Sequence, residues 1–125
     1  MKKLFMLLFI AVIALAACGT EESKKGTYET IAIDQIEEKV KEGYKVVDVR
    51  EFSEYATGHI VGAANKPLTE LQKSNFELLS KEDSYIIICQ SGNRSKQASE
   101  ILVEEGYTVL NVSEGMSSWT GEIEK

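Results

Sequence analysis

Short apolar runs, bounded by turn-forming or charged residues, divide this chain into segments. Residues 44–49 (YKVVDV) and 85–89 (YIIIC) have nearly continuous hydrophobic cores, and residues 31–33 and 107–112 form two weaker runs. Runs of this length that are rich in Val, Ile and Tyr predict strands. A further extended stretch is expected at residues 63–65, within an otherwise irregular segment.

The segments between these strands have helical spacing. Ile36 and Val40 lie four residues apart, and Gly43 closes the helix that they predict. Asp34, followed by Glu37 three residues later, predicts a capping box at its start. The other predicted helical segments are residues 51–56, 95–105, 116–119 and 69–80, the last with a break near Ser74 and with Leu71, Leu78 and Leu79 facing inward.

Apolar strands that alternate with helices predict an α/β fold, in which a small parallel β-sheet is flanked by helices on both faces. Ligands of such open sheets bind beyond the carboxyl ends of the strands. We therefore expect the functional site where three segments meet: residues 48–50, the residues from 89 onward and those from 113 onward.

The first 17 residues predict a signal peptide. Lys2 and Lys3 precede an uncharged run that extends from residue 4 to residue 17. As a helix this run would be about 21 Å long, which is shorter than the ~30 Å hydrocarbon core of a bilayer. The run therefore indicates export rather than a membrane span.

The apolar run ends in Leu15-Ala16-Ala17-Cys18, which resembles the lipobox of bacterial lipoproteins. The resemblance implies cleavage before Cys18 and acylation of its sulfur, which would anchor the protein at the extracytoplasmic face of the cell membrane. The alternative is a plain secretory signal that is cut after Ala17 and carries no lipid. The expected organisation is a lipoprotein signal peptide at residues 1–17, a lipidated Cys and flexible tether at 18–27, and a folded domain at 28–125.

Composition and charge exclude several classes of protein. Hydrophobic residues make up 43% of the chain and charged residues 27%, which is typical of a globular protein. The pI of about 4.9 argues against nucleic-acid binding. Loss of residues 1–17 would change the net charge from −6 to −8, so attachment to a membrane would depend on acyl chains rather than on anionic headgroups.

The chain contains two cysteines, Cys18 and Cys89. If Cys18 is acylated, Cys89 is an unpaired thiol in an exported protein, which indicates a reactive group. The alternative is an inert cysteine that packs as a small hydrophobic residue.

The segment that starts at Cys89 favours the reactive thiol. It reads Cys89-Gln90-Ser91-Gly92-Asn93-Arg94-Ser95 and connects a strand to a helix. Such a loop directs backbone N–H groups toward one point, with the helix dipole behind them, and Arg94 adds a permanent positive charge. A thiol in this position should have a lowered pKa and exist partly as the thiolate. The alternative is a polar turn after a core strand.

This loop resembles the Cys-x-x-Gly-x-Arg-Ser active site of the rhodanese-like sulfurtransferases. Two further segments are similar to motifs of that family, in the same order: Asp48-Val49-Arg50 leading to Glu54-Tyr55-x-x-Gly58-His59-Ile60-x-Gly62-Ala63, and Glu114-Gly115-Met116 leading to Trp119. Together the motifs cover about residues 31–120 and resemble the single-domain form of the family.

The resemblance implies transfer of a sulfane sulfur from thiosulfate or a persulfide donor to a thiol or other nucleophile. Cys89 would be the nucleophile and would cycle between thiolate and persulfide, while Arg94 would steady the loop. The substrate cradle would consist of Gln90, Ser91, Gly92, Asn93 and Ser95. No cofactor is implied, and one His with one free Cys does not make a typical zinc site.

Gln90 departs from the family pattern, because many members that use thiosulfate have Arg or Lys at this position. An amide donates hydrogen bonds but attracts a dianion less than a cation does. Lys96, in the first turn of the predicted helix, is a candidate to compensate. Both thiosulfate and a small persulfide or polysulfide therefore stay open as the donor.

Four residues of the motifs are predicted to support the fold rather than to react. Asp48 and Arg50 would pair with each other or with neighbouring loops, and Trp119 would pack under the loop after the last strand. His59 is the only histidine, and we expect a structural role because sulfur transfer from a preformed thiolate needs no base.

Two other functional classes stay open. Phosphatases and arsenate reductases with related cysteine loops place five residues between Cys and Arg, whereas four separate Cys89 from Arg94. A shorter loop fits a sulfur atom better than a phosphate. The second class is a sulfur carrier, redox sensor or binding module on the same fold, which rapid turnover with a small thiol would distinguish from an enzyme.

Overall fold

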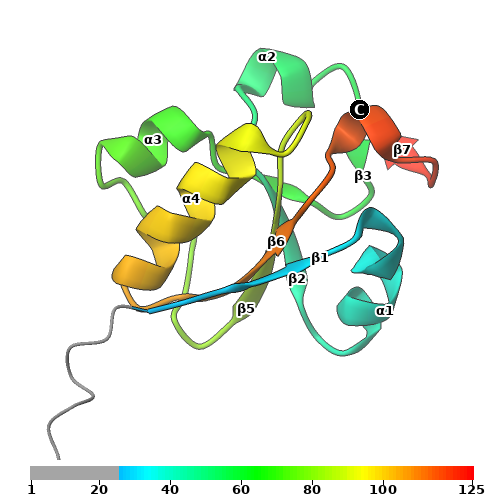
Figure 1. The fold of residues 1–125 in the computed structure, drawn as a ribbon. Helices are drawn as coiled ribbons and strands as arrows, with labels where there is room; N and C mark the ends of the chain where they lie inside the picture. Colours follow the sequence, from blue (N-terminus) through cyan, green and yellow to red (C-terminus); the bar gives the residue numbers. More distant parts are fainter. Residues whose placement is uncertain (1–25) are drawn as a thin grey trace, which may run out of the picture.

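Five parallel strands form the centre of the structure, a computed structural model that describes residues 26–125 (Figure 1). Their order across the sheet is β1-β6-β5-β2-β4. The strands are Glu29–Ile31 (β1), Lys45–Asp48 (β2), Ala64–Asn65 (β4), Ser84–Ile88 (β5) and Thr108–Val112 (β6). The apolar residues 85–88 of the middle strand are all buried, as expected for a strand that is covered on both faces.

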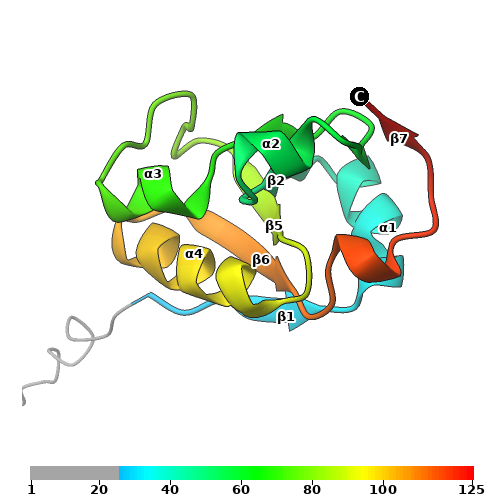
Figure 2. The ribbon, with the colours of Figure 1, turned by 90° about the horizontal axis from the view of Figure 1, so that it is seen from above.

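Helices cover both faces of this sheet (Figure 2). The helical segments are η2 (Ile33–Gln35), α1 (Ile36–Lys41), α2 (Phe52–Tyr55), α3 (Leu68–Gln72), α4 (Asn93–Glu104) and η3 (Met116–Ser118), where η marks a 3-10 turn. On one face, Leu71 of α3 and Leu102 of α4 pack in the same cluster as Ile87 of β5. On the other, Ile36 of α1 packs with Ile88. The predicted α/β fold, a parallel sheet flanked by helices on both faces, is therefore confirmed.

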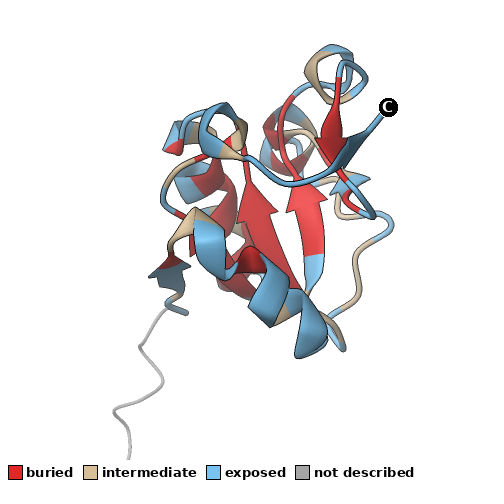
Figure 3. Cartoon of the chain, turned by 90° about the vertical axis from the view of Figure 1, so that its right-hand side faces the viewer, coloured by how far each residue is buried: buried red, intermediate tan, exposed pale blue. Residues whose placement is uncertain are grey.

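A second, smaller sheet was not predicted from the sequence. It pairs β3 (His59–Ile60) with β7 (Ile123–Glu124) in antiparallel orientation. Both residues of β3 are buried and both residues of β7 are exposed, so the C-terminal segment covers β3. Figure 3 shows the same contrast for the whole domain, with buried central strands and exposed outer helix surfaces.

The predicted start of the first helix is wrong in detail. β1 ends at Ile31, so the chain leaves the strand two residues earlier than expected. The backbone N–H of Ala32 donates to Oε1 of Gln35 at 2.8 Å, and the N–H of Gln35 donates to the carbonyl of Ala32 at 3.0 Å, so these two residues close η2. Asp34 lies inside this turn and not at its start, so the predicted box between Asp34 and Glu37 does not form.

The predicted helix at residues 69–80 ends at Gln72. Ser74 and Leu78 have φ angles of 65° and 77°, in the left-handed region that an α-helix does not contain. Leu78 is 88% exposed rather than buried, because the chain turns at this residue. Leu71 is buried and Leu79 packs against the core, as predicted.

The predicted signal peptide and Cys18, with its predicted lipid, lie outside the described residues. Within residues 26–125, the structure contains no helix of the length and apolarity that a bilayer crossing requires.

Candidate active site

The loops that follow β2, β5 and β6 meet around Cys89, at the carboxyl edge of the sheet where the sequence predicts the site. Backbone hydrogen bonds fasten these loops to one another. The N–H of Val49 donates to the carbonyl of Ile88 at 2.9 Å, and the N–H of Met116 donates to that of Cys89 at 2.8 Å. The segments 48–50, 89–95 and 113–117 therefore form one unit.

The sulfur of Cys89 lies at the base of its loop. The backbone N–H groups of Gly92 and Ser95 donate to Sγ at 3.1 Å and 3.2 Å. α4 begins at Asn93, two residues earlier than predicted. The free backbone amides at the start of this helix therefore point at the sulfur. The residue is only 1% exposed, so the loop and its neighbours almost fully enclose it.

Burial and hydrogen bonding act on this thiol in opposite directions. Burial raises the pKa of Cys89, but hydrogen bonds from the Ser95 hydroxyl and from the backbone of Ser95, Gly92 and Ser91 outweigh it. The pKa of Cys89 is therefore lowered, in the direction expected from the loop sequence. Hydrogen-bond donors, more than a nearby cation, stabilise the thiolate.

Gly92 shapes the cradle. Its φ angle of 103° lies in the left-handed region, and a Cβ at this position would lie 2.4 Å from the carbonyl oxygen of Ser113. Any side chain here would therefore be strained and would collide with the loop after β6. On either side of Gly92, Ser91 and Asn93 are exposed and form the outer rim.

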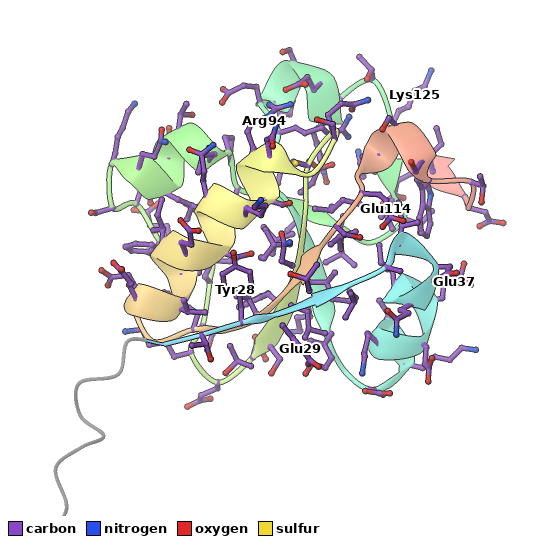
Figure 4. All side chains as sticks on the ribbon, in the orientation of Figure 1. Tyr28, Glu29, Glu37, Arg94, Glu114 and Lys125 are labelled. Atoms are coloured by element: carbon purple, nitrogen blue, oxygen red, sulfur yellow. The ribbon has the colours of Figure 1, made fainter. Side chains whose placement is uncertain are left out.

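The guanidinium of Arg94 binds a carboxylate. Its Nη1 and Nη2 donate to Oε1 and Oε2 of Glu54 at 2.7 Å and 3.0 Å. Figure 4 shows Arg94 at the start of α4, beneath α2, which carries Glu54. The hydrogen bond from Arg94 is the main reason that the pKa of Glu54 falls to about 2. The Glu54–Arg94 pair joins the cysteine loop to α2. Glu54 belongs to the family motif found in the sequence, but its contact with Arg94 was not predicted.

Asp48 and Arg50 form a buried ion pair at the end of β2. Oδ2 of Asp48 lies 2.8 Å from Nη2 of Arg50, and the side chains are 1% and 5% exposed. Arg50 also donates to the carbonyl of Gly58 at 2.8 Å and to Oε1 of Gln90 at 3.2 Å. The two residues thus pair with each other and with neighbouring loops, as predicted. The bond to Gln90 was not predicted.

His59 is held between α2 and the C-terminal strand. Its ring stacks on that of Tyr55 with centroids 3.6 Å apart, and Nδ1 lies 2.9 Å from the Tyr55 carbonyl oxygen. Nε2 lies 3.6 Å from a carboxylate oxygen of Glu124. Trp119 packs against the second core cluster and donates from Nε1 to the carbonyl of Glu122 at 3.0 Å. Among residues 26–125, no group of three or more His, Cys, Asp or Glu side chains is placed to hold a metal ion.

Residues 32–122 match the family model described as "Rhodanese-like domain". This match covers most of the chain, so the protein belongs to the rhodanese-like domain family. The family motifs lie at the end of β2 and in α2 and β3, in the cysteine loop at the start of α4, and in the segment after β6.

Three similar proteins illustrate the range of this family. The "Putative sulfur carrier protein YrkF" of Bacillus subtilis is 39% identical over 75% of this chain, which spans only about half (52%) of YrkF. The "Thiosulfate sulfurtransferase PspE" of Escherichia coli is 37% identical over 56% of this chain and 68% of its own length. A crystal structure of a Staphylococcus saprophyticus protein matches with a TM-score of 0.70 and 31% identity, over 78% of this chain and 99% of that one.

Proposed function

We propose that this protein is a sulfurtransferase that carries a sulfane sulfur on Cys89. The observation that supports this most directly is the pair of backbone amides, from Gly92 and Ser95, that donate to Sγ. Fixed amides stabilise a thiolate, and later a persulfide anion, without moving a proton. The family, and relatives named as a sulfurtransferase and a sulfur carrier, support the same class.

The proposed reaction has two steps. The thiolate of Cys89 first attacks the outer sulfur of the donor. A new S–S bond forms, the donor's own bond to that sulfur breaks, and its electron pair leaves with sulfite or with a thiolate. An acceptor thiolate then attacks the outer sulfur of the Cys89 persulfide, takes that sulfur and releases the Cys89 thiolate. Each step exchanges one sulfur bond for another, so the cycle needs no external oxidant and follows a ping-pong course.

The other residues of the site would act as supports. The Glu54–Arg94 pair and the Asp48–Arg50 pair hold the walls of the cradle through α2 and the end of β2. His59 needs no catalytic part, because hydrogen bonds to Sγ lower the pKa of the nucleophile without a neighbouring base. The donor and the acceptor would approach past Ser91, on the exposed rim of the loop.

Intact mass spectrometry of the purified full chain tests this function. After incubation with thiosulfate or with glutathione persulfide, we expect the mass to increase by one sulfur atom. The Cys18→Ser variant should still gain the sulfur, since Cys89 is then the only cysteine, and the Cys89→Ala variant should not. Absence of the added sulfur with every donor would reject the proposal.

A second measurement separates an enzyme from a carrier. If the protein is an enzyme, a small thiol such as dithiothreitol should discharge the persulfide and allow many turnovers with excess donor. A carrier would load once and release its sulfur only slowly to such a thiol. The relative named as a sulfur carrier makes this comparison necessary.

We further propose that the protein is attached to the extracytoplasmic face of the cell membrane through lipid on Cys18. The support is the Leu15-Ala16-Ala17-Cys18 sequence at the end of an apolar run. The Cys18→Ser variant should move from the membrane fraction to the soluble fraction. Retention of that variant in the membrane fraction would reject the lipid anchor.

A further inference from the structure

The two arginines that border the cysteine loop are both neutralised by carboxylates. Arg94 binds both oxygens of Glu54, and Nη2 of Arg50 lies 2.8 Å from a carboxylate oxygen of Asp48. Gln90, directly after the cysteine, uses its side-chain oxygen to accept from Arg50. Both arginines are therefore engaged within the protein, while Lys96 is exposed on the first turn of α4.

These groups lie close enough to one another to act as one charged cluster. The pKa of Arg94 is raised. The hydrogen bond to Glu54 is the largest cause, and the negative charges of Cys89 and Glu51 raise the pKa further. The charge of Arg50 contributes in the same way to the lowered pKa of Glu54. Asp48, Glu51 and Glu54 outnumber the two arginines by one negative charge, and the Cys89 thiolate adds another.

A negative site of this kind distinguishes sulfur donors by charge. Attack on thiosulfate brings a dianion to a thiolate and releases sulfite with two charges. Attack on a protonated persulfide brings no added charge to the reacting sulfur and releases a thiolate with one negative charge. Because Coulomb energies scale with the product of the charges, the dianion is disfavoured more strongly than a singly charged or neutral donor.

We propose that Glu54 is a specificity-determining residue, which acts through Arg94 to select sulfane-sulfur donors that carry at most one negative charge over dianionic thiosulfate. This inference rests on the proposed function and specifies its substrate class. Glu54 does not contact the reacting sulfur in this scheme. It occupies the Arg94 guanidinium, which would otherwise be available to an anion at the rim of the loop.

Two donors that differ by one charge provide the test. Methanethiosulfonate carries the same type of sulfane sulfur as thiosulfate, but a methyl group replaces one charged oxygen. The rate of persulfide formation on Cys89 is measured with each donor by intact mass spectrometry. Intrinsic reactivity is the same for every variant, so a change in the ratio of the two rates between variants reports the charge of the site.

The Glu54→Gln variant removes the charge and keeps the shape. Glutamine can still accept from the N–H of Glu51, as Glu54 does at 3.1 Å, so the start of α2 is retained. We expect its preference for methanethiosulfonate over thiosulfate to fall about tenfold relative to the wild type. The Glu82→Gln variant makes the same change just before β5, at the opposite edge of the sheet from Cys89, and should leave the ratio unchanged.

A second measurement needs no variant. If the site repels thiosulfate, salt should screen that repulsion and increase the rate of loading from thiosulfate in the wild type. An unchanged donor ratio in Glu54→Gln, or a thiosulfate rate that falls with salt, would overturn the inference while leaving the proposed function intact. Failure of both donors to load the wild type would instead reject the proposed function, and this inference with it.

Discussion

The backbone N–H of Met116 donates to the carbonyl oxygen of Cys89 at 2.8 Å, so the loop after β6 is fastened directly to the proposed nucleophile. The N–H of Ser117 makes the equivalent bond to the carbonyl of Gln90 at 3.0 Å. Gly115 permits this approach, because a Cβ there would lie 2.3 Å from the carbonyl group of Gln90 and 2.6 Å from that of Cys89. The shape of the cradle therefore depends on a backbone contact that other residues would prevent.

Replacement of Gly115 by Ala should disturb both stability and sulfur loading. The φ angle of Gly115 is −158°, which any residue adopts, so the cost is steric and not conformational. We expect a loss of about 2 kcal/mol in the free energy of unfolding, as for other overpacked sites, and slower persulfide formation on Cys89. Urea unfolding and intact mass spectrometry measure the two effects.

Gly43→Ala is the matched control for that change. Gly43 has a φ angle of 110° and nothing within 4 Å of a Cβ, so its replacement strains the backbone without a collision. We expect a loss of about 1 kcal/mol from the left-handed conformation, with sulfur loading unchanged. If Gly115→Ala loaded as rapidly as Gly43→Ala, the proposed role of the loop after β6 would be wrong.

The Asp48→Asn variant should be strongly destabilised, because it leaves the charge of Arg50 buried and without its carboxylate. Removal of one partner of a buried ion pair costs about 3–5 kcal/mol. Asp83→Asn provides the comparison, since Asp83 pairs with Lys45 at 3.1 Å with side chains that are 35% and 62% exposed. That change should cost less than about 1 kcal/mol. Equal free energies of unfolding for the two variants would contradict the structural role assigned to Asp48.

The Ser95→Ala variant should raise the pKa of Cys89. Burial, the largest influence on this thiol, raises its pKa, and the Ser95 hydroxyl is among the donors that outweigh burial. Without that hydroxyl, the thiolate absorbance should appear at higher pH than in the wild type, and the pH at which sulfur loading reaches half of its maximum should move upward with it. Ser91→Ala keeps the backbone donor and should leave the titration in place. An unshifted titration in Ser95→Ala would show that the backbone amides alone hold the thiolate.

Much of this site could be predicted from the sequence because it depends on strand ends. The apolar run at residues 85–89 places Cys89 at the carboxyl edge of the sheet, and the residues after it suit a turn into a helix. The same reasoning brings residues 48–50 to that edge, since parallel strands end together. Hydrophobic pattern was therefore sufficient for the sheet and for the position of the nucleophile.

The side-chain pairs around the loop could not be predicted in the same way. Glu54 and Arg94 lie 40 residues apart, and their contact depends on where α2 sits above the sheet. The bond between Arg50 and Gln90 also spans 40 residues. β3 and β7 have two residues each, which is too short for a recognisable alternation of polar and apolar positions. Leu78 was predicted to face the core because the helical spacing of apolar residues does not indicate its left-handed φ angle.

The contribution of the Glu54–Arg94 pair to stability should depend on acid pH. The pKa of Glu54 falls from 4.5 to about 2 in the folded protein, first because of the hydrogen bond from Arg94. The folded state therefore binds this proton less readily than the unfolded state. The pair stabilises the fold fully above pH 4.5, and the stabilisation is lost as the pH falls toward about 2.

Comparison of wild type with Glu54→Gln at several pH values measures this contribution. The Glu54 side chain is 37% exposed and screened by solvent, so the variant should be less stable by about 1 kcal/mol or less at neutral pH. In urea unfolding experiments, the difference in the free energy of unfolding should shrink toward zero as the pH approaches 2. Glu82→Gln retains the Glu54–Arg94 pair, so the contribution of that pair cancels in its comparison with the wild type. If the difference in the free energy of unfolding between wild type and Glu54→Gln stayed constant down to pH 2, protonation of Glu54 would have no effect on stability. The ion pair would then not stabilise the fold.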